Sequence, residues 1–139
     1  MSGKLKIIFY WNAACGGCEV ALLDINERFL KLAAIADIVF SPVMMDGKVS
    51  DVEALPDDSV DLAFVNGAIR NHENTHLVRL IRQKSRVLVS FGSCANWGGI
   101  PALANLSSRE ELLKRVYETT ESTVNPQGLR PDWSSSLED

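Results

Sequence analysis

The stretch that decides the fold is Leu5-Lys-Ile-Ile-Phe-Tyr-Trp11, which runs directly into Asn12-Ala-Ala-Cys-Gly-Gly-Cys18. The first part is apolar and rich in β-formers, as in a buried strand, and the glycines after it are typical of a turn. From Cys18 the apolar residues recur at helical spacing, which predicts one helix to about Ala34. A buried strand, a glycine turn and a helix together make one unit of an α/β fold.

The same strand-then-helix pattern returns further along the chain. Strands that alternate with helices favour parallel pairing through right-handed crossovers. The sequence therefore predicts a doubly wound parallel α/β sheet with helices on both faces. Among the strand orders that this class allows, we choose the flavodoxin-like order 2-1-3-4. The expected strands are residues 37–43, 60–65 and 86–91, the expected helices are 71–84 and 107–117, and a short helical turn and loop is expected over 51–59.

The length and composition are those of one globular domain. The chain has 139 residues, of which 46% are hydrophobic and 23% charged, and its formal net charge of -4 argues against nucleic acid as a partner. We expect the domain to cover residues 1–119 and a loosely ordered tail to cover 120–139, where the periodic pattern stops. The longest apolar runs are far shorter than the roughly 20 residues of a membrane span, and no secretory signal precedes the first strand, so we expect a cytoplasmic protein.

Three cysteines fall in two of the strand-to-helix loops. Cys15 and Cys18 follow the first expected strand and Cys94 follows the fourth, and glycines stand beside all three. In the predicted order, the carboxyl ends of these strands lie about 10 Å apart. An odd number of cysteines, two of them close together, favours a metal, cluster or redox site over a disulfide framework. We therefore predict that the three thiols converge at one edge of the sheet, around a single cluster-sized volume.

Other interpretations of these residues stay open. A Cys-x-x-Cys pair also serves redox dithiols and zinc sites, and free cysteines are often ordinary buried side chains. His72 and His76 have a spacing that could bind a metal, but we expect them on a solvated helix face. Glu19 follows the second cysteine directly. We expect it to be a carboxylate stabilised by the helix dipole, and the alternative is contact with a proton or a partner.

Two segments carry a resemblance to a known family. Trp11-Asn-Ala-Ala-Cys-Gly-Gly-Cys-Glu19 and Gly92-Ser-Cys-Ala-Asn-Trp-Gly-Gly-Ile-Pro101 resemble the cluster-binding segments of nickel–iron hydrogenase small subunits. That superfamily includes the 20 kDa subunit of respiratory complex I. Val65-Asn-Gly-Ala-Ile-Arg70 and the run from Gly98 to Tyr117 are similar to cytosolic, viologen-reducing hydrogenase chains. The resemblance covers about residues 5–128.

The resemblance implies an electron-transfer subunit of an oxidoreductase, with no catalytic centre of its own. Such a subunit holds a proximal 4Fe-4S cluster beside a large subunit with the nickel–iron centre, and it works with other electron-carrier subunits. By position, Cys15, Cys18 and Cys94 match three of the family's four cluster ligands. The fourth lies in a Pro-Gly-Cys-Pro-Pro-like segment that is not found here, so we expect a truncated chain. A non-cysteine or borrowed ligand is the alternative.

Two further functions compete with electron transfer. A chain without the fourth ligand would be a cluster-free interaction module that keeps the docking surface, and Cys15 with Cys18 would suit a small dithiol oxidoreductase. For the electron-transfer subunit and for the cluster-free module, we expect an apolar rim near the cysteines, formed by Trp11, Trp97 and Ile100. Such a rim marks a docking site for a larger partner, or for a second copy in a homodimer when the chain is isolated.

Overall fold

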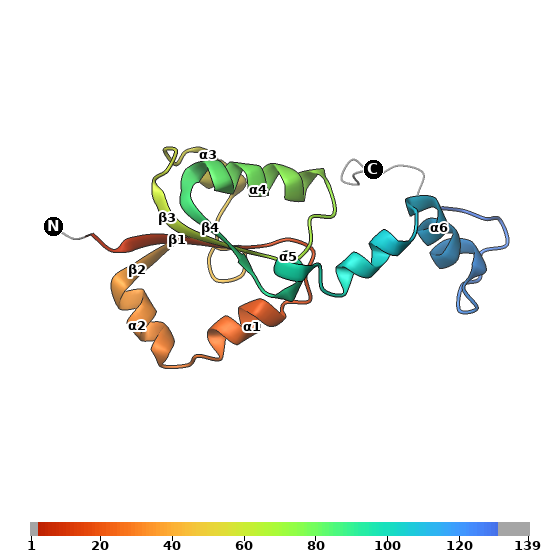
Figure 1. The fold of residues 1–139 in the computed structure, drawn as a ribbon, viewed down its shortest axis with the longest axis horizontal. Helices are drawn as coiled ribbons and strands as arrows, with labels where there is room; N and C mark the ends of the chain where they lie inside the picture. Colours follow the sequence, from red (N-terminus) through yellow and green to blue (C-terminus); the bar gives the residue numbers. More distant parts are fainter. Residues whose placement is uncertain (1–2, 131–139) are drawn as a thin grey trace.

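The structure is a computed structural model that describes residues 3–130, and in this part of the chain four parallel strands form one sheet (Figure 1). The strand order is β2-β1-β3-β4, as the sequence predicted. The strands are β1 (Leu5–Trp11), β2 (Ala36–Phe40), β3 (Val60–Asn66) and β4 (Ser85–Phe91). Both central strands are bordered by parallel neighbours, so every strand ends at the same edge of the sheet.

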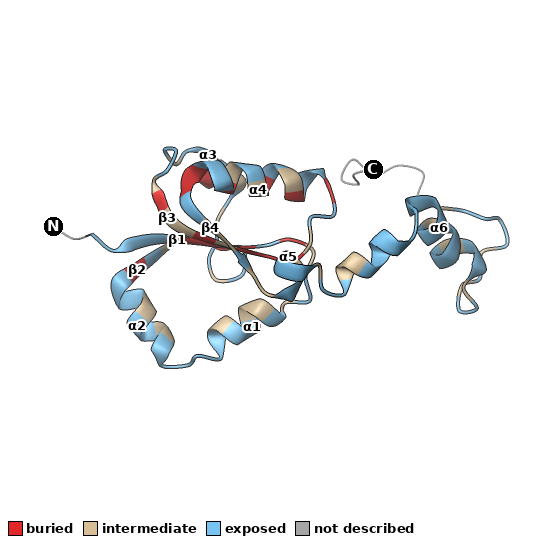
Figure 2. Ribbon diagram, viewed as in Figure 1, coloured by how far each residue is buried: buried red, intermediate tan, exposed pale blue. Residues whose placement is uncertain are grey.

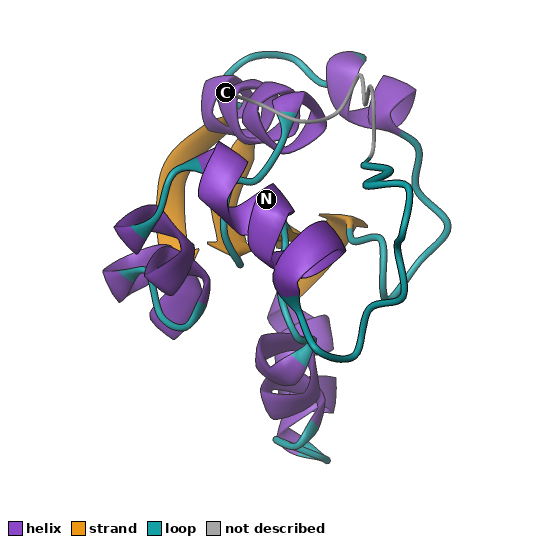
Figure 3. Cartoon of the chain, turned by 90° about the vertical axis from the view of Figure 1, so that its right-hand side faces the viewer, coloured by secondary structure: helices purple, strands orange, loops and turns teal. Residues whose placement is uncertain are grey.

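Helices cover both faces of the sheet, and Figure 3 shows the strands as a layer between helices above and below. One face carries α3 (Val49–Glu53) and α4 (His72–Lys84), and the other carries α1 (Gly17–Leu23) and α2 (Arg28–Ile35). The predicted α/β class with helices on both faces is confirmed. None of the helices within residues 3–130 is long and apolar enough to cross a membrane.

The prediction of one helix from Cys18 to Ala34 is wrong, because the chain turns between α1 and α2. Asn26 adopts a left-handed backbone with φ of 51°, and its side-chain amide donates to the carbonyl of Asp24 over 2.7 Å. Asparagine tolerates this conformation because its short side chain can bond to the nearby backbone, which competes with helix formation. The local hydrogen bond therefore prevails over the apolar periodicity.

Strand β2 is also shorter than expected, and the last predicted helix begins later and changes its type. The chain leaves β2 at Phe40, and the amide of Met45 donates to the carbonyl of Ser41 over 3.1 Å in a turn that contains Pro42. Proline has no N–H for the ladder, so the expected strand could not continue to residue 43 as a paired strand. The helix expected over 107–117 forms as α6 (Arg109–Lys114) and continues as a π-helical turn, η2 (Arg115–Thr119).

The core lies on both faces of the sheet but is deeper under α4. Ile8, Val60 and Ile81 are fully buried on the α4 side, whereas α1 and α2 carry half-buried and exposed residues (Figure 2). On the other face the rings of Phe9 and Phe64 stack with their centroids 4.9 Å apart. Burial of these side chains stabilises the sheet, and α1 adds little of its own to that core.

The C-terminal part of the described chain extends away from the sheet (Figure 1). It consists of α5 (Ser93–Trp97), the 3-10 helix η1 (Pro101–Leu106), α6 and η2. Arg130 pairs with Glu110 and Glu118, which ties residues 120–130 back onto α6 and η2. The hydrogen bond from Arg130 lowers the pKa of the Glu118 carboxyl below its usual value. The rest of the expected tail, residues 131–139, lies outside the described residues.

Two valines in adjacent strands give a matched test of this packing. Val60 in β3 is fully buried, and Val87 in β4 is 48% exposed. We expect Val60→Ala to lower the free energy of unfolding by about 2 kcal/mol, because it removes two buried methyl groups and leaves a cavity. Val87→Ala should cost less than about 1 kcal/mol. Urea unfolding measures both changes, and equal losses would contradict the packing described here.

Candidate functional site

The ends of three strands line up at one edge of the sheet. Trp11 at the end of β1 is in register with Asn66 at the end of β3, and Asn66 is in register with Phe91 at the end of β4. The loops that carry the predicted site residues therefore start side by side. Cys18 lies in the first turn of α1 and Cys94 in the first turn of α5.

The loops after β1 and β3 are joined by their backbones. Ala13 and Ala68 exchange two hydrogen bonds, of 3.0 Å and 2.9 Å. Gly67 precedes Ala68 with φ of +80°, and a Cβ placed there would lie 2.8 Å from the carbonyl oxygen of Ala13. Glycine is required at this position because a side chain would push the two loops apart. The loop after β3 is thus held against the loop that leads to Cys15.

Cys18 lies against the end of β4. Its sulfur is 4.0 Å from the carbonyl oxygen of Phe91, and a Cβ placed on Gly92 would lie only 2.3 Å from that sulfur. Gly92 also has φ of +84° and ψ of 168°, a backbone conformation that is open to glycine and strained for other residues. The Cys-x-x-Cys segment therefore meets the Cys94 loop directly, although β3 lies between their strands.

The other two cysteines have different surroundings. Cys15 is exposed, and Cys94 is half-buried beside Gly99, where a Cβ would lie 3.1 Å from the Cys94 sulfur. All three are free thiols. Within residues 3–130, no group of three or more His, Cys, Asp or Glu side chains is placed to hold a metal ion. It stays a prediction that the three thiols converge around a single cluster-sized volume.

The donor chemistry of the three cysteines indicates which cofactor the edge could hold. Thiolates are soft ligands that suit iron–sulfur clusters, copper(I) and zinc. An iron–sulfur cluster spreads its ligands over several irons, so its thiolates need not meet at one ion. The glycine backbone beside Cys18 and Cys94 leaves the sulfurs uncovered by a neighbouring Cβ. These residues therefore fit a sulfur-ligated cluster better than a single ion.

The two histidines are exposed on α4, as the sequence predicted for a solvated face. The imidazole Nε2 of His76 lies 4.0 Å from a carboxylate oxygen of Glu53 on α3. This contact is at the limit of an ion pair, and both side chains are more than half exposed. The pair contributes little at such exposure.

Sequence reasoning missed a buried polar cluster of Asn12, Glu19 and Asn66, which we call the amide cluster. The backbone N–H of Asn12 donates to the carbonyl of Asn66 over 2.8 Å, and its side-chain amide donates to the same oxygen over 3.2 Å. The side-chain amide of Asn66 in turn donates to a carboxylate oxygen of Glu19. One signal was in the sequence: an asparagine follows or ends both central strands at the candidate edge.

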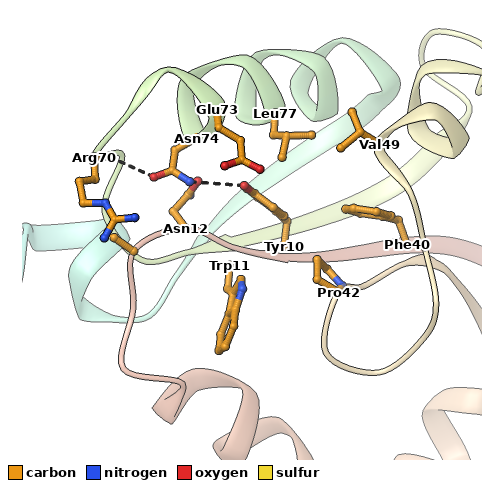
Figure 4. A pocket seen from close by; sticks show the side chains of 12 residues that line it. Tyr10, Trp11, Asn12, Phe40, Pro42, Val49, Arg70, Glu73, Asn74 and Leu77 are labelled. Atoms are coloured by element: carbon orange, nitrogen blue, oxygen red, sulfur yellow. Dashed lines mark hydrogen bonds between the residues drawn. The ribbon is translucent and has the colours of Figure 1, made fainter. Parts of the chain in front are cut away.

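A pocket of about 330 Å³ opens at the same edge, on the side of α3 and α4 (Figure 4). Phe40 and Leu77 form apolar walls, and the Asn74 side-chain amide lies 3.5 Å from the Tyr10 hydroxyl. Burial raises the pKa of the Tyr10 phenol, the Asn74 hydrogen bond lowers it and the charge of Glu73 raises it. Tyr10 therefore stays protonated over the ordinary pH range.

Comparison with known proteins decides the family. Residues 15–130 match the family described as NADH ubiquinone oxidoreductase, 20 Kd subunit. The chain belongs to this family. The resemblance to hydrogenase small subunits and the complex I 20 kDa subunit, stated above from the cysteine segments, is thereby confirmed.

Two proteins to which the chain is similar are hydrogenase subunits. The chain is 42% identical over 128 residues to the iron-sulfur subunit of the F420-non-reducing hydrogenase of Archaeoglobus profundus, covering 91% of this chain and 40% of that protein. It is 29% identical over 122 residues to the delta subunit of the NAD-reducing hydrogenase HoxS of Cupriavidus necator, covering 88% of this chain and 55% of that one. The chain thus spans about half the length, or less, of these two relatives.

A solved structure agrees with the family and the fold. An NAD+-reducing [NiFe]-hydrogenase in the H2-reduced state matches with a TM-score of 0.74 and 31% identity, over 93% of this chain and 71% of that one. This chain is therefore a member of the 20 Kd subunit family, and it is similar in sequence and fold to subunits of hydrogenases.

The contact between Gly92 and Cys18 generates a test of the candidate edge. Gly92→Ala should lower the free energy of unfolding by about 3 kcal/mol, because the new methyl group collides with the Cys18 sulfur in a strained backbone. Gly128→Ala is the control: Gly128 also has positive φ but nothing lies within 4 Å of its Cβ position. It should cost only about 1 kcal/mol.

Urea unfolding measures both glycine variants, and the reaction rate of Cys18 with a thiol reagent reports its displacement. We expect that rate to rise in Gly92→Ala and not in Gly128→Ala. Equal stability losses with unchanged Cys18 reactivity would contradict the close approach of the two loops.

Proposed function

We propose that this chain is an electron-transfer subunit of a nickel–iron hydrogenase-type oxidoreductase and holds a 4Fe-4S cluster through Cys15, Cys18 and Cys94. The observation that carries the proposal is the contact between the Cys-x-x-Cys segment and the Cys94 loop, at the sulfur of Cys18 and Gly92. The name of the Archaeoglobus profundus relative, an iron-sulfur subunit, supports it. When bound, such a cluster supplies one-electron transfer.

The backbone at this edge suits the negative charge of a sulfur-ligated cluster. Cys18 and Cys94 stand in the first turns of α1 and α5, where backbone N–H groups carry partial positive charge. The left-handed backbone of Gly16 before α1 allows the chain to turn between Cys15 and Cys18.

The proposal needs one ligand more than the cysteines provide. A 4Fe-4S cluster usually takes four thiolates, and the sequence contains three cysteines. We assign the fourth position to a side chain other than cysteine or to a cysteine outside these 139 residues. The three-cysteine count also supports a second candidate function, a cluster-free interaction module with the same fold.

The proposed partner is a larger subunit that carries the nickel–iron centre, with other electron-carrier subunits beyond it. Large apolar side chains are exposed close to the cysteine loops: Trp97 is 82% exposed, Ile100 81% and Trp11 40%. Exposed apolar groups of this size favour contact with another protein. The solved relative's name, an NAD+-reducing [NiFe]-hydrogenase, supports a nickel–iron partner.

Anaerobic reconstitution of the chain with iron and sulfide tests the proposal. We expect about four irons per chain and a broad absorbance band at about 400 nm. Cys15→Ser, Cys18→Ser and Cys94→Ser should each lose at least half of the iron, because each removes one thiolate. Ser93→Ala, next to Cys94 on the same exposed turn, is the control and should keep the wild-type iron content.

Two results would contradict this assignment. A wild-type chain without iron and absorbance would favour the cluster-free module. Iron that survives in all three cysteine variants would place the cofactor elsewhere in the chain.

A further inference from the structure

Helix α1, which carries Cys18, lacks most of the features that hold a helix in place. It has seven residues, no buried residue and no side-chain cap at Gly16. A helix this short is not stable in water by itself, so its position depends on contacts to the sheet. Two side chains of its first turn hydrogen-bond to the sheet: Cys18 through a long thiol contact to Phe91, and Glu19 through Asn66.

The Glu19 carboxylate points into the protein. One of its oxygens accepts from the side-chain amide of Asn66, and the other is buried with no hydrogen-bond partner among the described residues. The adjoining cavity, lined by Glu19, Asn66 and Leu22, has a volume of only about 10 Å³. That space holds one water at most.

The amide cluster connects α1 to both central strands. Asn66 is 2% exposed at the end of β3, and its carbonyl accepts both hydrogen bonds from Asn12 at the end of β1. Side-chain oxygens of Asn12 and Asn66 also lack partners within residues 3–130. A cluster with unpaired buried acceptors destabilises the fold, so its presence beside the cysteine loop favours a role in geometry over one in stability.

We propose that Glu19 is a positioning residue that fixes the Cys15–Cys18 loop against the ends of β1 and β3 through Asn66. The inference rests on the proposed function, because it assigns Glu19 to the alignment of two proposed cluster ligands. It adds to the sequence-based expectation that Glu19 is a helix-dipole carboxylate, since Glu19 does lie in the first turn of α1. Glu19 acts through the Asn66 amide and touches neither sulfur in this scheme.

Substitutions at these positions separate the effect of the Glu19–Asn66 hydrogen bond from the effect of the Glu19 charge. Glu19→Gln keeps an oxygen that accepts from Asn66 and adds an N–H donor beside the unpaired acceptors, so it should retain the wild-type loop. Glu19→Ala removes the acceptor and leaves the buried Asn66 amide unpaired. Asn66→Ala breaks the same hydrogen bond from the β3 side. Glu27→Ala, an exposed glutamate at the start of α2, is the control.

The first measurement is amide hydrogen exchange of Val20 and Asp24, whose N–H groups donate to the carbonyls of Gly16 and Val20, in the full apo chain. Urea unfolding verifies that each variant folds. We expect Glu19→Ala and Asn66→Ala to raise the exchange rate in α1 at least tenfold. Glu19→Gln and Glu27→Ala should stay within twofold of wild type. The Glu19→Ala, Asn66→Ala double variant should exchange no faster than either single variant, because one hydrogen bond is lost in all three.

The second measurement is the iron content and the electron paramagnetic resonance spectrum of the reduced chain after reconstitution. Glu19→Ala should lose at least half of the iron or change its g-values, and Glu19→Gln should restore both. Wild-type exchange rates in α1 of Glu19→Ala would overturn the inference, as would a loss in Glu19→Gln equal to that in Glu19→Ala. A wild-type chain that takes up no iron would refute the proposed function, whereas the exchange rates would still decide the positioning role.

Discussion

The parallel register of β1, β3 and β4 is the constraint on which the candidate site depends. Trp11, Asn66 and Phe91 are in register on neighbouring strands. The loops after the three strands therefore start side by side at one edge of the sheet. In a doubly wound sheet, ligands bind at such an edge, because the loops after the strands line a crevice there. Cysteines at sequence positions 18 and 94 thus come to lie in neighbouring loops without any contact between their own strands.

The site itself is built from backbone and small residues more than from packed side chains. Gly67 and Gly92 allow the loops to approach to distances that a Cβ would prevent, and α1 and α5 are too short to be stable without the sheet. Most of the apolar burial lies at a distance, beneath α4. The core therefore stabilises the sheet, and the hydrogen bonds of the loops and the amide cluster determine where the thiols stand.

Much of this arrangement could be predicted from the sequence, and the exceptions have physical causes. The Leu5–Trp11 strand, the glycine turn and the periodic α4 are local patterns, and the parallel pairing follows from the alternation of strands and helices. The order β2-β1-β3-β4 is one of several that this alternation allows, so it was chosen by analogy to flavodoxin-like sheets. The break at Asn26 could not be predicted, because a side-chain hydrogen bond prevails over an apolar pattern that runs through it. The amide cluster was missed because asparagines after strands are typical of turns. In addition, Glu19 is 47 residues from Asn66, to which it is hydrogen-bonded.

The central claim is that residues from the loops after β1 and β4 hold one cofactor between them. Anomalous diffraction at the iron absorption edge, on crystals of the anaerobically reconstituted full chain, tests it directly. We expect a single iron-centred peak bordered by Cys18 of α1 and Cys94 of α5. A peak beside His72 and His76, or crystals of iron-containing protein with no peak near either cysteine loop, would contradict the account.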